Sequence, residues 1–395
     1  MSLLSLEQAQ QRLLALAPQM GEEQVALDDA LGRVLTRDLE SRVKRPAADL
    51  SAMDGYALAG DGPWCCVGES RAGAPFDQRI DAGETVRIST GARLPDGADR
   101  ILIKEHAHID GDAVAATEMP TTGQYIRQQG SDFEQGASVL RRGTTIGPAQ
   151  IALAMAAGHA TIAVAKRPRI GVLDSGDELV RDPENCGDNQ IPASNGAMIA
   201  AMLHPLVGST ENLGAVPDDR AALSRALSDA EGLDIIITSG GASVGDHDHV
   251  QQALRDWGAS IDFWKVAMKP GKPMMVATRR SGDISQVIIG LPGNPVSSFV
   301  TAFMFALPLV RAAMGVPSPL PHRIATIAGV SLPATATRQE FLRGIFDGKM
   351  AIPLFSQDSS ALLALASANC LIERPVRSPA IAAGDPIDVF CIRNG

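Results

Sequence analysis

The region between residues 168 and 315 alternates short apolar runs with longer segments whose apolar residues recur at helical spacing. The short runs are RIGVL, LDIIITSGG, IDFWKVAM and SQVIIG, and the helical segments include SNGAMIAAMLHPLV, DDRAALSRALSDA and DHVQQALRDWG. Such alternation is typical of a doubly wound, mostly parallel sheet with helices on both faces. The pattern therefore predicts a central α/β domain over residues 168–315.

The patterning changes on both sides of this region. Residues 1–40 and 136–167 show helical and turn patterns, so we expect them to form an elongated helical and extended linker domain. Residues 41–135 contain short extended runs broken by glycine and proline, which predicts an inserted β-rich domain. After the stiff VPSPLP segment, residues 316–395 carry the short alternating strands of a small C-terminal β-barrel. The chain therefore reads as a four-domain α/β protein.

Composition and charge limit the classes of partner. The net charge of −10 argues against a nucleic-acid partner, which would need a basic surface. The longest apolar run, residues 299–310, is shorter than the roughly 20 residues of a membrane span and contains Pro308. The N-terminal segment reads as an amphipathic helix with Ser5 and Gln8 at capping-box spacing, not as a signal peptide. Five cysteines without a C-x-x-C pair favour a reducing cytoplasm. We expect no nucleic-acid partner and no membrane segment.

Four glycine- and proline-rich loops follow the predicted strands: DSGDEL, TSGGASVGDHD, MKPGKP and LPGNP. In open α/β sheets, ligands bind at the carboxyl ends of the strands. We therefore expect these loops to line one pocket.

The glycine-rich loop after residue 237 has the character of a phosphate-binding loop. Exposed N–H groups between a strand and a helix can bind a phosphate, and hydroxyl groups add further donors. The candidate residues are Ser239, Gly240, Gly241, Ser243 and Gly245. The alternative is a turn that only caps the next helix through Asp246. For His247 and His249, a solvated helix start is favoured over a metal site, because no third soft ligand is nearby.

Charged residues accompany the same loops. Three cations, Lys265, Lys269 and Lys272, fall within one strand and its following turn, which suits a diphosphate or an oxyanion. The alternative is a solvated loop with ordinary surface lysines.

Carboxylates occur in matching positions. The candidates for a magnesium site are Glu178, Asp218, Asp246 and Asp248. Hard oxygen ligands that face phosphates commonly hold Mg²⁺. Each acid taken singly is more often a helix cap than a ligand, so the prediction depends on their shared location at strand ends.

Two further motif groups are candidates. The LPGNP turn supplies Pro292, Gly293, Asn294 and Pro295, whose fixed backbone would make a rigid pocket rim with carbonyl groups free to face a ligand. In the β-rich region, SAMDGYA and ISTGARLPDGAD contain Asp54 and Thr90. Turn chemistry alone also explains both of these β-rich motifs.

These motifs, together with GSDFEQG and the late QDSSALLALASANCLI, occur in the order found in the molybdopterin molybdenumtransferase (MoeA) family, whose relatives include the C-terminal part of animal gephyrin. The chain resembles this family over nearly its whole length. The resemblance implies an α/β domain like that of MoaB and Mog proteins, and an elongated homodimer. It also implies an enzyme that takes adenylylated molybdopterin, releases AMP and inserts molybdate with the help of Mg²⁺.

The resemblance also assigns roles to particular residues. It implies that the catalytic positions are Asp54, Thr90, Asp132, Lys265, Lys269 and Ser359. It implies transient contacts with a molybdopterin adenylyltransferase and with the molybdoenzymes that accept the cofactor. The chain departs from the family pattern at Ala242, at His247 and at Asp174, which stands where a small residue is usual. Two alternatives remain at this point: an adenylyltransferase, against which the extra domains argue, and a clustering scaffold with the same dimeric fold.

Overall fold

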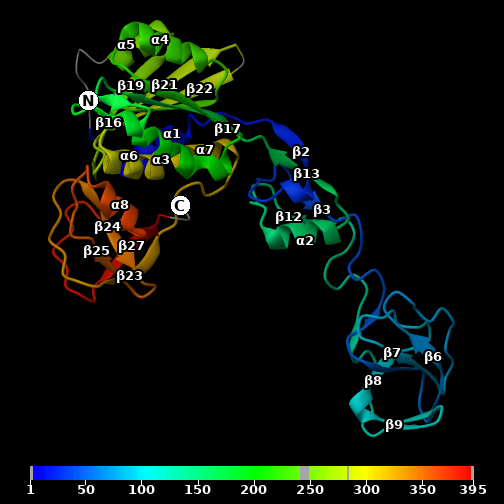
Figure 1. Ribbon diagram of the computed structural model, residues 1–395. Coiled ribbons are helices and arrows are strands. Elements are labelled where there is room, and N and C mark those ends of the chain that lie inside the picture. The colour runs from blue at the N-terminus through cyan, green and yellow to red at the C-terminus, as the bar shows by residue number, and fades with distance from the viewer. Residues whose placement is uncertain (1–2, 241–248, 283, 393–395) are drawn as a thin grey trace. The chain divides into compact units, whose positions relative to one another are not determined.

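The computed structural model describes residues 3–240, 249–282 and 284–392 (Figure 1). The chain forms two compact units. The first, here called the sheet-and-barrel unit, comprises Met1–Glu23, Gly32–Thr36 and Val164–Gly395. The second, here called the β-rich unit, comprises Gln24–Leu31 and Arg37–Ala163. The four-domain boundaries expected from the sequence stay a prediction.

The sheet-and-barrel unit is built on a seven-stranded sheet. In order across the sheet, the strands are β1 (Leu3–Leu4), β19 (Ser260–Val266), β21 (Pro273–Ser281), β22 (Ile284–Leu291), β18 (Ile235–Ser239), β14 (Arg169–Ser175) and β17 (Ser209–Val216). Every neighbouring pair is parallel except the two that involve β21, which runs antiparallel to β19 and β22. The predicted mostly parallel sheet is therefore confirmed.

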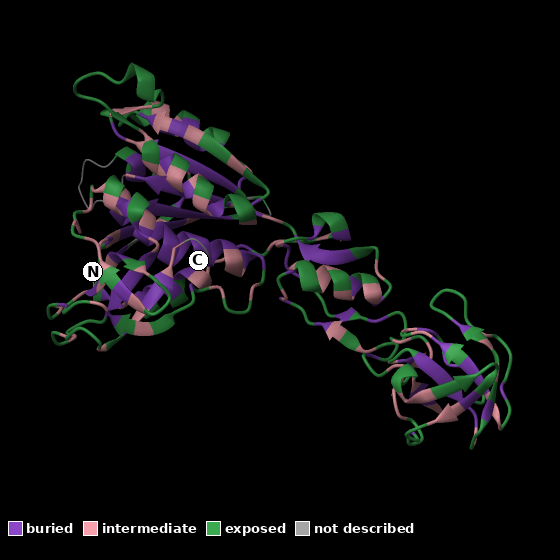
Figure 2. Ribbon diagram, turned by 60° about the horizontal axis from the view of Figure 1, so that its bottom comes forward, coloured by how far each residue is buried: buried purple, intermediate pink, exposed green. Residues whose placement is uncertain are grey.

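Helices cover both faces of this sheet, and Figure 1 shows α4 and α5 on one face and α1, α3, α6 and α7 on the other. Their bounds are α1 (Leu6–Leu14), α3 (Ser194–Leu203), α4 (Arg220–Asp229), α5 (His249–Asp256), α6 (Pro295–Thr301) and α7 (Leu307–Ala313). Successive residues of β18 alternate between two cores: Ile235 and Ile237 pack with α1, α3, α6 and α7, whereas Ile236 packs with α4 and α5. This period of two places both faces of the strand in apolar surroundings. Figure 2 shows the buried ribbon concentrated in these central strands.

Two helices of this layer carry details expected from the sequence. Ser5 and Gln8 form the predicted capping box at the start of α1. Helix α6 continues through a π-helical turn, Ala302–Ala306, into α7. By length and composition, the helix Pro295–Ala313 is the one described segment apolar enough to cross a membrane, but 83% of its apolar window is buried inside the protein. Its apolar character is therefore that of a core helix.

The C-terminal residues form the predicted β-barrel. Its strands are β23 (Ile324–Ala328), β24 (Gln339–Phe346), β25 (Met350–Pro353), β26 (Cys370–Arg374) and β27 (Pro386–Cys391), with the short helix α8 (Leu362–Ser367) before β26. The sheet closes because β24 pairs with both β25 and β26. A short strand, β20 (Met268–Lys269), pairs with β24 and so holds the Lys269 loop against the barrel.

The β-rich unit contains a six-stranded sheet. Its strands, in order, are β8 (Arg100–Ile103), β5 (Gly55–Leu58), β7 (Glu84–Ile88), β6 (Trp64–Ser70), β10 (Ala113–Ala116) and β9 (Ala107–Asp110). Two further antiparallel pairs join β3 (Leu39–Glu40) to β12 (Ser138–Leu140) and β4 (Leu50–Ser51) to β11 (Ile126–Arg127), and α2 (Pro148–Ala156) follows β12.

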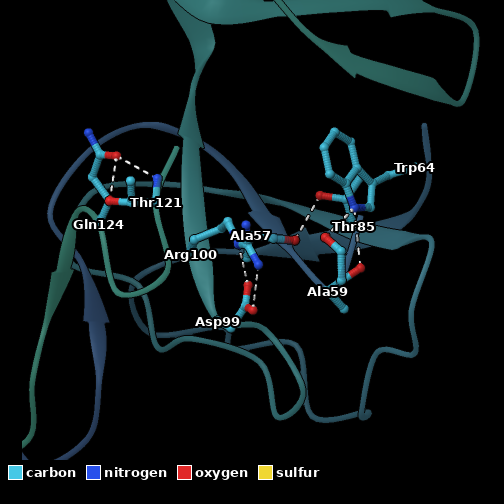
Figure 3. Close-up of polar contacts among 9 residues, drawn as sticks. Ala57, Ala59, Trp64, Thr85, Asp99, Arg100, Thr121 and Gln124 are labelled. Carbon is cyan, nitrogen blue, oxygen red and sulfur yellow. Dashed lines mark hydrogen bonds and ion pairs between the residues drawn. The ribbon is translucent and has the colours of Figure 1, made fainter. Parts of the chain in front are cut away.

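Buried and partly buried polar groups of this sheet are hydrogen-bonded, as Figure 3 shows. The Thr85 hydroxyl donates to the Ala57 carbonyl at 2.7 Å, and the Trp64 indole N–H donates to the Ala59 carbonyl at 3.2 Å. Arg100 donates two hydrogen bonds to the Asp99 carboxylate, at 2.7 and 2.9 Å. Buried polar groups are tolerated when they are paired in this way.

Candidate active site

A cavity of about 790 Å³ opens at the carboxyl ends of β14, β18 and β22. Its walls include Asp174 and Ser175 from the end of β14, Ser239 and Gly240 from β18, and the turn after β22. Carboxyl ends of parallel strands meet at one edge of a sheet, so loops distant in sequence gather there. We call this cavity the large pocket, and it lies where the sequence predicted a binding site.

The LPGNP turn forms one wall of the large pocket, which all four of its predicted residues, Pro292 to Pro295, line. Asn294 is the N-cap residue of α6, and Pro295 is the first helical residue, where its missing N–H leaves no hydrogen bond broken. The Gly293 carbonyl accepts a hydrogen bond from the Asn195 side-chain amide at 2.7 Å. Pro295 therefore starts the helix, and the turn before it lines the pocket.

The end of β18 supplies the described part of the predicted phosphate loop. Ser239 and Gly240 line the large pocket. Gly240 has φ +99°, and a Cβ atom there would lie 2.6 Å from the Ser175 carbonyl oxygen, so no other residue type fits without a shift. The rest of the loop lies outside the described residues, namely Gly241, Ser243, Gly245 and Asp248, together with Asp246 and His247.

A second cavity, of about 360 Å³, is the small pocket and carries most of the cationic character of the site. Its lining includes Lys269, Arg338 and Arg343, and it also contains Glu340. The Lys269 ammonium lies 3.2 Å from the Glu340 carboxylate. The predicted catalytic residue Ser359 lines this pocket as well. Asp358 lines the pocket too, so three basic side chains accompany two acidic ones, and the net positive charge of the lining suits an anion.

Arg343 is the most unusual of these cations because its side chain is only 1% exposed. One terminal nitrogen donates to the Ser356 and Asp358 carbonyls, at 3.1 and 3.0 Å, while the buried Nε has no partner. Burial lowers the pKa of this guanidinium, and the nearby Asp358 carboxylate opposes that effect. Gln357 bonds both the N–H and the carbonyl of Arg343, so the loop before Ser359 is fixed to β24.

The two pockets adjoin. Ser360 lines the large pocket, whereas its neighbour Ser359 lines the small one. The Asn294 side-chain amide donates to the Ser359 hydroxyl at 3.0 Å, and the Val296 N–H donates to the Ser359 carbonyl at 3.0 Å. The start of α6 and the loop around Ser359 therefore form a shared wall, so ligands in the two pockets would be neighbours.

Of the predicted magnesium ligands, two are described. Glu178 lines the large pocket. The Asp218 carboxylate accepts a hydrogen bond from the Ser175 hydroxyl at 2.5 Å, and its N–H donates to Asp177 at 2.9 Å. Over the described ranges, no group of three His, Cys, Asp or Glu side chains is placed to hold a metal ion. Since Asp246 and Asp248 lie outside those ranges, the carboxylate site stays a prediction.

The lysine cluster is divided in the structure. Lys269 lines the small pocket, whereas neither Lys265 nor Lys272 is among the described residues that line the two pockets. Lys265 is half-buried in β19 opposite Pro273, and the exposed Lys272 accepts the Val266 N–H through its carbonyl. The structure therefore brings one of the three predicted lysines into a cavity.

The remaining predicted residues belong to the β-rich unit. The Asp54 carboxylate accepts hydrogen bonds from the Thr90 N–H at 2.7 Å and from the Thr90 hydroxyl at 2.9 Å. The Thr90 N–H is the main cause that holds the pKa of Asp54 below its usual value, followed by the hydroxyl. Asp132 lies 3.4 Å from the Arg45 guanidinium in an exposed ion pair. Asp54 and Thr90 therefore form one local polar group, a contact that was not predicted from the sequence, and their catalytic roles stay a prediction.

Several pocket residues were not predicted from the sequence. They are Asn195, Ser297, Arg338, Glu340, Arg343, Gln357 and Asp358. The two arginines stand in the mostly polar run TRQEFLR, whose local sequence gives the appearance of a solvated surface segment. A basic residue at an inward-facing strand position would have indicated Arg343 as a pocket residue. The strand register, which the sequence does not reveal, is needed to know which positions face inward.

Comparison with known proteins places this chain in a family. Models described as "MoeA N-terminal region (domain I and II)", "Probable molybdopterin binding domain" and "MoeA C-terminal region (domain IV)" match residues 4–158, 171–312 and 326–391. The molybdopterin molybdenumtransferase of Haemophilus influenzae is 31% identical over 98% of each chain. Molybdopterin molybdenumtransferase 2 of Mycobacterium tuberculosis is 34% identical over 93% of this chain and 94% of the relative.

A solved structure shows the same fold. The molybdopterin biosynthesis MoeA protein of Pyrococcus horikoshii OT3 superposes with a TM-score of 0.85 at 24% identity, covering 99% of this chain and 100% of that chain. Fold, pockets and relatives together define a protein of molybdenum cofactor biosynthesis. The chain belongs to the molybdopterin molybdenumtransferase (MoeA) family, which confirms the resemblance seen in its motifs.

Proposed function

We propose that the chain transfers molybdenum from molybdate to adenylylated molybdopterin, with release of AMP, as a Mg²⁺-dependent homodimer in the cytoplasm. Family membership supports the molybdenum transfer itself. The observation that carries the finer proposal is the pair of adjoining pockets that share the wall between Asn294 and Ser359. One reactant can occupy each pocket, with the reacting groups held next to each other.

The large pocket has the size and chemistry for the organic substrate. Its volume of about 790 Å³ falls in the range of sites for nucleotide- or pterin-sized ligands. The glycine-rich end of β18 offers backbone donors to a phosphate, and the LPGNP turn is a rigid rim. The Asn195 side-chain amide donates hydrogen bonds to the Ser239 hydroxyl and to the Gly293 carbonyl of the turn. These bonds fix both groups in the pocket wall before a ligand binds.

The small pocket suits molybdate. Lys269, Arg338 and Arg343 present positive charge to a tetrahedral oxyanion, and the Ser359 hydroxyl can donate a hydrogen bond to it. Charge-assisted hydrogen bonds of this kind are about twice as strong as neutral ones. We infer that these cations hold molybdate beside the dithiolene sulfurs while the substrate is bound in the large pocket.

The carboxylates near the large pocket fit a magnesium ion in their chemistry. Glu178 on the pocket wall and Asp218 beside the end of β14 are hard oxygen donors of the kind that Mg²⁺ prefers. The ion would neutralise charge on the phosphates as AMP leaves. The residues themselves orient the phosphate end of the substrate, and the Ser175 hydroxyl fixes the Asp218 side chain.

The proposal is tested by following AMP release from adenylylated molybdopterin with purified protein. We expect release to require both molybdate and Mg²⁺, to stop with excess chelator, and to resume when Mg²⁺ is added back. Consumption of ATP by the protein with free molybdopterin would instead identify an adenylyltransferase. Absence of any turnover with an intact dimer would favour the scaffold alternative. We also propose transient contacts with the adenylyltransferase that supplies the substrate and with the molybdoenzymes that accept the product, and no membrane or nucleic-acid partner.

A further inference from the structure

Asp174 is a buried carboxylate in the wall of the large pocket. It lies at the carboxyl end of β14, opposite Ser239 of β18 in the sheet register, and only 6% of it is exposed. One oxygen, Oδ2, accepts the Gly196 N–H at 2.9 Å. The other, Oδ1, is buried and has no hydrogen-bond partner. By hydrogen-bond geometry Oδ2 is therefore satisfied and Oδ1 is not, although the neighbouring Ser239 hydroxyl also favours the charged carboxylate.

Asn195 presents a second unsatisfied acceptor in the wall of the same pocket. Its side-chain nitrogen donates to the Ser239 hydroxyl at 2.8 Å and to the Gly293 carbonyl at 2.7 Å, which fixes the orientation of the amide. Its Oδ1 atom is buried and has no partner. Buried acceptors are rarely left without donors, because each one loses its hydrogen bonds to water. Two such oxygens in one pocket wall indicate a ligand that brings N–H donors.

A capping role explains only part of this arrangement. Gly196 lies in the first turn of α3, and the N-cap residue Ala193 makes no side-chain cap hydrogen bond. Asp174 therefore caps the helix through Oδ2 in place of Ala193. Capping does not need Oδ1, which makes no hydrogen bond to the helix. Burial raises the pKa of Asp174, while the Gly196 N–H and the Ser239 hydroxyl oppose this shift. A ligand N–H that donates to Oδ1 would also favour the charged carboxylate and so lower the pKa of Asp174.

We propose that Asp174, together with Asn195, is a specificity-determining residue that accepts N–H groups from an amino-substituted heteroaromatic ring of the substrate. This inference rests on the proposed function, which puts the organic substrate in the large pocket. Two parts of adenylylated molybdopterin have the required chemistry: the pterin carries a 2-amino group, and the adenine carries a 6-amino group. Each has an oxo analogue in which an acceptor replaces the donor.

The test compares binding of these matched ligands. Pterin is compared with lumazine, which carries oxygen in place of the 2-amino group, and AMP is compared with IMP, which carries oxygen in place of the 6-amino group. Affinities are measured by calorimetry and by the fluorescence of the pteridines, with the full-length protein. We expect the wild type to prefer the amino member of one pair by about tenfold or more, as a hydrogen bond to a charged acceptor predicts. The pair that shows the preference identifies the ring that Asp174 contacts.

Two substitutions separate recognition from capping. In Asp174→Asn, the amide oxygen can keep the Gly196 N–H, which puts the amide nitrogen at the Oδ1 position and turns an acceptor into a donor. We expect this variant to reverse the preference, so that the oxo analogue binds more tightly. Asp174→Ser should bind the amino ligand and its oxo analogue with similar affinity. The matched control is Asp182→Asn, an exposed carboxylate that also accepts a backbone N–H but is not among the residues lining the large pocket.

The outcomes distinguish this inference from the proposed function. If Asp174→Asn lowers the melting temperature and leaves both ligand preferences unchanged, Asp174 is only a helix cap and the inference is overturned. A wild-type preference for the oxo analogues would also overturn it, because Asp174 would then not recognise the exocyclic amino group. If the wild type shows no molybdate-dependent AMP release, the proposed function fails whatever the binding data show. If the wild type releases AMP but shows no amino preference, only the inference fails.

Discussion

At the scale of single residues, the small pocket is lined by more basic than acidic side chains. Lys269 has one described acidic neighbour, Glu340, and its side chain is 54% exposed. Arg343 is buried and uses its guanidinium on backbone carbonyls, which are neutral. The three basic side chains of the lining outnumber its two acidic ones, so net positive charge remains. In the proposed molybdate site, Lys269 would contact the oxyanion directly, and Arg343 also fixes the loop.

Replacing Lys269 by Ala tests the direct contact. We expect the molybdate concentration that gives half-maximal AMP release to rise about tenfold, because one charge-assisted contact is worth about 1.5–3 kcal/mol before solvent screening. Lys349→Ala, at an exposed turn between β24 and β25, is the control for loss of a surface cation. An unchanged molybdate dependence in Lys269→Ala would remove this lysine from the oxyanion site.

Thr90 allows a test of pH behaviour at the Asp54 group. The folded protein depresses the pKa of Asp54, so this group stabilises the fold above its unfolded pKa, and the contribution is lost as the pH falls through the folded pKa. Thr90→Val removes the hydroxyl donor but keeps the N–H donor, which is the larger cause. We expect the pKa of Asp54 to rise and to stay below its usual value, as followed by carbon NMR of the carboxyl group. An identical titration in the variant would show that the hydroxyl does not contribute.

At the scale of elements, the helix that begins at Pro295 links the pocket wall to the packing of the sheet and of the barrel. Phe303 in its π-helical turn is 1% exposed, stacks on Phe299 at 6.3 Å and meets the edge of Phe390 in β27 at 6.4 Å. The helix therefore packs against the barrel as well as the sheet. This packing explains why so long an apolar helix follows a pocket-forming turn: its burial fixes the position of Asn294.

Phe303→Ala tests this packing. Truncating a fully buried phenylalanine lowers the free energy of unfolding by about 3–5 kcal/mol, and we expect a loss of that size in urea denaturation followed by circular dichroism. Phe355→Ala is the matched control, because Phe355 is fully exposed and its truncation should change stability by about 0.5 kcal/mol or less. Equal effects of the two substitutions would contradict the assignment of Phe303 to a shared core.

The helices and strands differ in how well the sequence predicts them. The buried strands of the sheet, the α1 capping box and the barrel were predicted because their apolar spacing is regular. Three strands of this sheet were missed: β1, β17 and β21. β1 has only two residues, and edge strand β17 begins with the polar run STEN. β21 begins with Pro273 and follows a glycine- and proline-rich turn, which hid its short apolar run.

The candidate site was predicted in part for a similar reason. Loops rich in glycine and proline are recognisable, so the residues of the LPGNP turn were identified, and Asn294 indeed bonds the Ser359 hydroxyl across 65 positions of sequence. Arg343 was not identified, because local sequence does not distinguish an inward-facing cation in a strand from a solvated one. Asp174 was recognised only as a departure from the family pattern, and its unpaired oxygen appears only once α3 and β14 are packed together.

At the scale of the whole molecule, the predicted site residues are divided between two compact units. The sheet-and-barrel unit holds both pockets, whereas Asp54, Thr90 and Asp132 belong to the β-rich unit. The six-stranded sheet is formed by residues that lie between β3 and β12 in the sequence. These two strands pair antiparallel, so the chain enters and leaves the sheet at neighbouring points. There Ser41 and its partners are close: the Ser41 N–H donates to the Ala137 carbonyl, and the Gly136 N–H donates to the Ser41 carbonyl, both at 2.8 Å.

This geometry permits removal of the β-rich sheet as a test of its role. Residues 42–135 can be replaced by an Asn-Gly turn, because a two-residue turn joins antiparallel strands whose ends are this close. We expect the shortened protein to fold and to bind AMP in the large pocket with unchanged affinity, and to lose molybdate-dependent AMP release. Full-length Asp54→Ala should reproduce that loss with the fold intact, which distinguishes loss of catalytic groups from loss of structure. Turnover at the full-length rate in the shortened protein would mean that Asp54, Thr90 and Asp132 are not needed, and that the two pockets perform the transfer alone.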